Sequence, residues 1–98
     1  MAMLLGRSEK RNAAAVTVML TSPELPFPTE VALTENISSR GARVVSKGLW
    51  EKNNSLVIKS LDGGLQSEAR VIYRRPIRED VYAIGLELIA PRGDWRER

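Results

Sequence analysis

The strongest constraint on the fold is the hydrophobic pattern, which repeats at every second residue along most of the chain. Val16, Val18 and Leu20 alternate with other residues, and Ile84 and Leu86 do the same near the end. This alternation is the mark of a β-strand with one buried face. No segment shows the stripe of apolar residues that a long helix would need. The chain is therefore expected to be all-β.

Turn-forming residues divide this pattern into six predicted strands. Three prolines make residues 21–29 a loop, because proline is excluded from central strands. A cluster of polar residues and glycine marks a turn at residues 36–41, and a second turn begins with proline at residues 76–80. The Asp-Gly-Gly sequence at 62–64 predicts a hairpin. The predicted strands cover residues 16–20, 31–34, 42–45, 55–61, 65–75 and 81–88.

A chain of 98 residues has room for one domain. Six short strands in so small a domain favour a closed antiparallel barrel, because closure removes exposed strand edges. We expect a flexible N-terminal segment at residues 1–13, the barrel at residues 14–90 and a short C-terminal tail at residues 91–98. The tail shows no strand or helix pattern, although Trp95 could attach it to a surface.

The composition argues against an enzyme. The chain has no Cys and no His, which excludes disulfides, zinc fingers, thiol nucleophiles and imidazole bases. No close pair of carboxylates stands out, so we expect no metal, no cofactor and no catalytic residue. The net charge is +3, and eleven of the fifteen basic residues are Arg. Arginine binds phosphates and planar acceptors with two parallel hydrogen bonds, so a ligand with negative charge is favoured.

The sequence also predicts where the protein works. No run reaches the roughly 18 apolar residues of a membrane span. The apolar stretch of residues 13–20 is short, is interrupted by Thr17 and is not followed by a cleavage site typical of signal peptides. We therefore expect a cytoplasmic protein that does not enter a membrane.

The first candidate for binding is the pair Arg7 and Arg11, four residues apart. Spacing alone says little, because chance predicts about one such pair in a chain of this composition and the sequence has four. The second candidate is more specific. Asn36, Ser38 and Gly41 form an Asn-x-Ser-x-x-Gly motif, which chance predicts about 0.04 times per chain. The alternative interpretation of these residues is a plain turn, in which the glycine supplies a positive φ.

The third candidate is a basic cluster on the fifth predicted strand and the turn after it: Arg70, Arg74, Arg75 and Arg78. Such a stripe could bind the phosphates of a nucleic acid. Small barrels that do so usually add exposed aromatic residues for base stacking. Here Tyr73 is predicted on the face opposite Arg70 and Arg74, and Tyr82 on the inner face. Nucleic-acid binding is therefore the weaker alternative.

The first two candidates suit one site. In a small barrel, the segment before the first strand and the turn after the second can meet at the same rim. Arginine donors can pair with guanine O6 and N7 and with phosphates. Asn36 and Ser38 can accept hydrogen bonds from the other guanine edge. A purine nucleotide with phosphates would suit such a site.

These residues resemble the binding motifs of the PilZ domain family. The resemblance spans residues 7–90. It rests on an RxxxR motif, an Asn-x-Ser-x-x-Gly motif after the second strand, four further strands, and the sequence Tyr-Ala-Ile-Gly in the last strand. It implies a six-stranded bacterial barrel that binds the second messenger cyclic di-GMP.

The resemblance also implies a role for each motif residue. Arg7 and Arg11 would hold the phosphates and the guanine edges. Asn36 and Ser38 would meet a guanine edge, and Gly41 would leave the turn open for the ligand. The further candidates that flank the motif are Arg40 and Arg43.

We expect a receptor without catalytic activity that acts through an unidentified protein partner. Binding of the anionic ligand would change the conformation of the N-terminal arginine segment, because it neutralises two nearby positive charges. Two alternatives stay open. One is an adapter of the same fold that binds no nucleotide, and the other is a small barrel that binds nucleic acid.

Overall fold

The described part of the chain forms six β-strands, in the order that the sequence predicts. The computed structural model describes residues 13–23, 29–48 and 50–95. Within these residues there is no helix, and so none long and apolar enough to cross a membrane. The strands are β1 (Thr17–Thr21), β2 (Thr29–Ser38), β3 (Gly41–Ser46), β4 (Ser55–Ser60), β5 (Leu65–Arg78) and β6 (Val81–Gly93).

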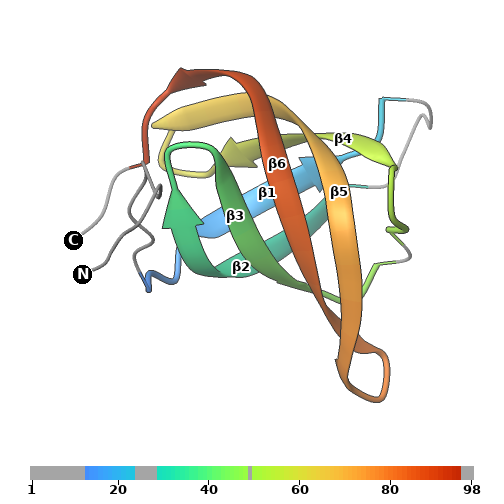
Figure 1. Ribbon diagram of the computed structural model, residues 1–98. Helices are drawn as coiled ribbons and strands as arrows, with labels where there is room; N and C mark the ends of the chain where they lie inside the picture. Colours follow the sequence, from blue (N-terminus) through green and yellow to red (C-terminus); the bar gives the residue numbers. More distant parts are fainter. Residues whose placement is uncertain (1–12, 24–28, 49, 96–98) are drawn as a thin grey trace, which may run out of the picture.

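The strands close into one barrel in which each pairs antiparallel with two neighbours (Figure 1). The order around the barrel is β1-β2-β3-β6-β5-β4, and pairing of β1 with β4 completes the circle. Closure satisfies the backbone groups of strands that would otherwise be edges. The predicted six-stranded antiparallel barrel is confirmed.

The apolar members of the alternating pattern fill the interior. In β3, Ala42 and Val44 are buried, whereas Gly41, Arg43 and Val45 on the other face are only partly buried. Burial of a large aliphatic side chain stabilises the fold by about 1.5–3 kcal/mol. The large side chains that are almost completely buried are Leu20, Ile37, Leu56, Ile58, Ile84 and Leu86.

β2 is longer than predicted. The expected strand at residues 31–34 continues to Ser38, and the expected turn at residues 36–41 contracts to Ser39 and Arg40. Asn, Ser and Gly usually mark turns, but here the backbone pairing between β2 and β3 holds them in strands. The candidate motif is therefore mostly strand.

The β5–β6 hairpin is also longer than predicted. The turn expected at residues 76–80 contracts to Glu79 and Asp80. Asp80 has a φ of 62°, a conformation that Asp adopts more readily than most residues. The hairpin continues past the end of the barrel as a projecting two-stranded ribbon (Figure 1). Its pairing shifts between Val71 and Tyr73, which changes the faces of the residues that follow.

β6 continues to Gly93, which pairs with Leu65. The expected boundary between the barrel and the tail of residues 91–98 is therefore too early. The cause is local: Ala90 has a φ of 53° and lies where the β5–β6 register shifts. Such an irregularity interrupts the alternating pattern, so the end of β6 does not look like a strand in the sequence.

Candidate functional site

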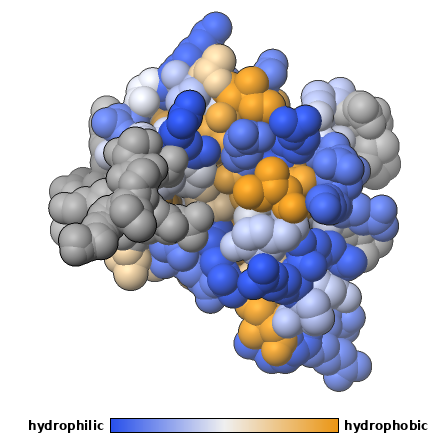
Figure 2. Space-filling view, in the orientation of Figure 1, coloured by the Kyte–Doolittle hydropathy of each residue, from blue (hydrophilic) through white to orange (hydrophobic). Residues whose placement is uncertain are grey.

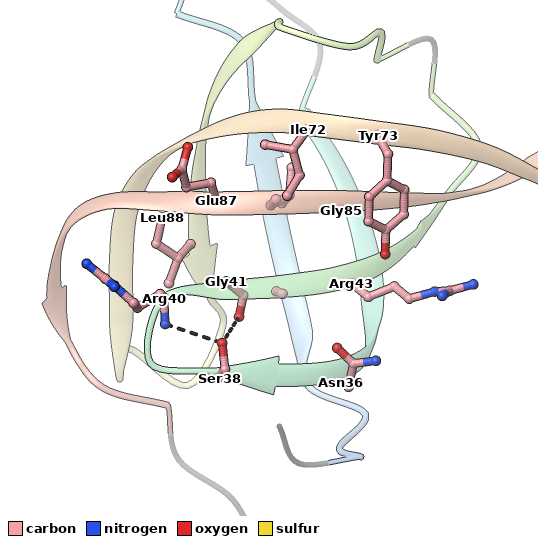
Figure 3. A pocket seen from close by; sticks show the side chains of 12 residues that line it. Asn36, Ser38, Arg40, Gly41, Arg43, Ile72, Tyr73, Gly85, Glu87 and Leu88 are labelled. Carbon is pink, nitrogen blue, oxygen red and sulfur yellow. Dashed lines mark hydrogen bonds between the residues drawn. The ribbon is translucent and has the colours of Figure 1, made fainter. Parts of the chain in front are cut away.

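A hollow of about 350 Å³ lies on the outside of the barrel over β2, β3, β5 and β6 (Figure 3). One side of it contains the predicted motif residues Asn36, Ser38 and Gly41 with the flanking residues Arg40 and Arg43. The structure thus brings these five predicted site residues together. The opposite side is formed by residues of β5 and β6: Ile72, Tyr73 and residues 85–88.

A β-bulge in β2 turns the motif toward this hollow. The β2–β3 register shifts between Thr34 and Asn36, so Glu35 is the extra residue and lies beside Arg43. Thr34 faces the core before the bulge, and Ile37 faces it afterwards. A step of three residues between inward side chains reverses the faces of the strand. The asparagine and serine of the motif consequently line the outer hollow.

Ser38 keeps some hydrogen-bonding capacity. Its Oγ accepts a hydrogen bond from the Arg40 amide at 3.3 Å and donates one to the Gly41 carbonyl at 3.5 Å (Figure 3). Both are longer than the roughly 2.7–3.0 Å of strong hydrogen bonds, so the hydroxyl can exchange them for a ligand. The Ser38 carbonyl is more firmly held, because it accepts a hydrogen bond from Trp95 Nε1 at 2.8 Å. Trp95 also packs against the core and attaches the end of β6 to the site.

Gly41 has a packing role. It is not one of the described residues with a positive φ, so the alternative of a turn glycine with that conformation is wrong. A Cβ atom on Gly41 would lie 2.7 Å from the carbonyl oxygen of Leu86. The missing side chain lets β3 and β6 pair closely beneath the hollow.

The two flanking arginines have different surroundings. Arg43 Nε lies 2.8 Å from Glu35 Oε1, with about a third of the Arg43 side chain and somewhat more of the Glu35 side chain exposed. Arg40 is exposed and has no ion pair among the described residues. Partly exposed pairs usually stabilise by about 0–1 kcal/mol, so Arg43 can exchange its carboxylate for another anion.

The opposite wall contains residues that the sequence analysis did not select. The ring of Tyr73 lies over Gly85 so closely that a Cβ atom there would overlap it. Glu87 lies on the same wall, and its Oε1 accepts a hydrogen bond from Arg70 Nη2 at 3.2 Å. Gly85 is the sequence feature that could have indicated this wall, because a glycine inside a strand often marks the close approach of another group.

Arg7 and Arg11 lie outside the described residues. The described chain begins at Ala13, and the next residue, Ala14, has a carbonyl oxygen that accepts a hydrogen bond from Thr34 Oγ1 at 2.5 Å. The same hydroxyl accepts a hydrogen bond from the Val16 amide at 2.8 Å. These contacts attach the start of the barrel to β2, directly before its bulge.

The basic cluster of β5 has aromatic partners, which corrects the expectation that it lacks them. The Arg74 guanidinium carbon lies 3.8 Å from the Tyr82 ring centroid, and that of Arg75 lies 4.7 Å from the Tyr73 ring centroid. The register shift after Val71 moves Tyr73 from its predicted face. One face of each ring is already covered by a guanidinium, which does not favour stacking of nucleic-acid bases.

The surface in Figure 2 is mostly hydrophilic, with hydrophobic residues in separate small areas. Within the described ranges, no group of three or more acidic side chains could hold a metal ion. A polar, charged ligand fits such a surface better than a large apolar one. Among the residues that the structure describes, the exposed large apolar side chains are Val31, Leu33, Leu61, Ile72, Ile77 and Ile89.

Comparison with known proteins supports the fold. No protein-family model matches the chain. No curated protein matches it either. Among solved structures, it is similar to the Bacillus subtilis inhibitor of motility, MotI/DgrA, with 21% sequence identity and a TM-score of 0.67. The match covers 88% of this chain and 43% of that chain, so this chain spans less than half of its structural neighbour. The barrel is of the PilZ type.

Proposed function

We propose that this protein binds cyclic di-GMP in the hollow and passes the signal to a protein partner. The observation that supports this most strongly is the bulge at Glu35, which turns Asn36 and Ser38 into the hollow that Arg40 and Arg43 also line. The likeness to MotI/DgrA supports a PilZ-like adapter. The choice of cyclic di-GMP as the ligand rests on the resemblance of the two sequence motifs to those of the PilZ family.

The chemistry of the hollow suits this ligand. Guanine presents O6 and N7 as acceptors, with which an arginine can form two parallel hydrogen bonds. The donors on its other edge can meet the side-chain oxygens of Asn36 and Ser38. The guanidinium groups of Arg40 and Arg43 can also pair with the two phosphates, which together carry two negative charges.

A short stretch of chain separates the arginine motif from a residue that is attached to β2. Arg11 precedes Ala14 by three residues, and three extended residues span at most about 11 Å. Ala14 is attached to Thr34, one residue before the bulge. We propose that Arg7 and Arg11 complete the site when the ligand binds, and that the resulting change in the N-terminal segment creates the surface that a partner recognises.

The proposed receptor is cytoplasmic and has no catalytic activity. The sequence contains none of the Cys or His residues that many catalytic sites use. Among the described residues that line the hollow, Glu87 is the one carboxylate, and it is paired with Arg70. These features support binding as the role of the hollow.

Calorimetric titration of the full chain with cyclic di-GMP tests the proposal. We expect saturable binding that Arg11→Ala weakens by about 10- to 150-fold, the loss expected for a hydrogen bond to a charged group. Arg78→Ala, which removes the same charge near the tip of the β5–β6 hairpin, is the matched control and should bind like the unmodified protein. GTP should bind far more weakly than cyclic di-GMP.

A flat titration curve from a folded protein would contradict the proposed function. That result would favour the adapter that binds no nucleotide. Equal losses in Arg11→Ala and Arg78→Ala would instead show that overall positive charge, and not the arginine motif, attracts the ligand.

A further inference from the structure

Glu35 is a residue that the proposed binding motif does not include. It is the extra residue of the β2 bulge, and its carboxylate lies 2.8 Å from Arg43 Nε. Glu35 does not line the hollow, whereas Arg43 does. The Arg43 guanidinium can therefore pair either with the Glu35 carboxylate or with an anion bound in the hollow.

The contact between Glu35 and Arg43 can be exchanged. Arg43 Nε is shielded from solvent, but the approach of the carboxylate is that of an ion pair and not of a well-aligned hydrogen bond. About 42% of the Glu35 side chain is exposed, so water can solvate the carboxylate when it is released. A pair of this kind holds its partners weakly.

We infer that Glu35 is an internal competitor for Arg43 that sets how tightly the hollow binds a phosphate-bearing ligand. This inference rests on the proposed function. While Glu35 is paired with Arg43, it neutralises one of the positive charges beside the hollow. A ligand phosphate must displace or share this contact, and it also meets repulsion from the nearby carboxylate.

The competition also affects which ligands bind. The Glu35 carboxylate is part of the same chain and stays beside Arg43. An anion that binds through Arg43 alone therefore gains too little binding free energy to displace it. A ligand with two phosphates, held at the same time by Asn36 and Ser38, can replace it. The bulge that directs Asn36 and Ser38 toward the hollow thus also places Glu35, whose carboxylate limits ligand binding, beside Arg43.

A double-mutant cycle measured by calorimetry with cyclic di-GMP tests this inference. Glu35→Gln keeps the size of the side chain and removes its charge. We expect it to tighten binding by about 2- to 5-fold, which corresponds to the strength of a partly exposed ion pair. Glu79→Gln makes the same change in net charge at the exposed turn of the β5–β6 hairpin and should leave the affinity unchanged.

The second arm of the cycle uses Arg43→Ala. This change should weaken binding, and Glu35→Gln should give no gain in its background, because the competitor then has nothing to compete for. Thermal unfolding of each variant confirms that it is folded.

The outcomes separate the two proposals. Tighter binding by Glu35→Gln that depends on Arg43 supports the inference. Binding by the unmodified protein with no gain in Glu35→Gln, or with a gain that persists without Arg43, overturns the inference alone. Absence of binding in every folded variant overturns the proposed function, and the inference with it.

Discussion

The β2–β3 and β5–β6 hairpins are built alike but present their arginines differently. Each closes with two residues, and the strand pairing shifts once in β2–β3 and three times in β5–β6. In β2–β3 the shift turns polar side chains into a concave hollow beside Arg43. In β5–β6 the hairpin projects from the barrel, and Arg74 and Arg75 lie on tyrosine rings. The number and spacing of arginines therefore do not define an anion site; the groups around them do.

The largest expected effect concerns the backbone beneath the hollow. Gly41→Ala places a Cβ atom 2.7 Å from the Leu86 carbonyl oxygen, so β3 and β6 must move apart. We expect a loss of about 1–3 kcal/mol in the free energy of unfolding, measured by urea denaturation.

Gly63→Ala provides the control for this change. Gly63 has a φ of 81° but no atom within 4 Å of the added Cβ, so only the conformational cost of about 1 kcal/mol applies. A larger loss in Gly63→Ala than in Gly41→Ala would contradict the packing role of Gly41.

A smaller effect separates the two hairpins by function. Asn36→Ala removes a hydrogen-bonding group from the hollow and should weaken cyclic di-GMP binding by about 2- to 12-fold. Arg74→Ala, on the β5–β6 hairpin and in contact with Tyr82 outside the hollow, should leave the affinity within experimental error. Calorimetry of both variants checks this, and the reverse order of effects would place the ligand on the projecting hairpin.

The smallest expected effect concerns the arginine–tyrosine contacts. Tyr82→Leu keeps an apolar side chain but removes the ring that Arg74 covers. We expect the free energy of unfolding to fall by about 0.5–1 kcal/mol and ligand affinity to stay the same. If Tyr82→Leu lowers the free energy of unfolding equally in an Arg74→Met background, the contact between Tyr82 and Arg74 is not the cause of the loss.

The sequence predicts the regular parts of the fold because strand alternation is local. The buried residues of β3 and β4 lie where the period of two places them, and the Asp-Gly-Gly turn joins β4 to β5 as expected. Closure into a barrel also follows, since six short strands in a small domain have few other ways to cover their edges.

The bulges explain what could not be predicted. A bulge depends on the pairing of two strands, whereas a single strand shows only a break in its pattern. In β2 the break is the three-residue step from Thr34 to Ile37, both of which are buried. In β5 the shift near Ile72 moves Tyr73 to the wall of the hollow. Five residues of the hollow were therefore predicted from the sequence, whereas its wall of β5 and β6 residues was not.

The central claim is that the anion site is the hollow and not the projecting hairpin. The most direct test is mapping of amide chemical shifts by NMR while cyclic di-GMP is added to the full chain. We predict the largest changes in residues 36–43 and 85–88, with little change in residues 76–82. Largest changes in residues 76–82, or no change at a large excess of ligand, would contradict the claim.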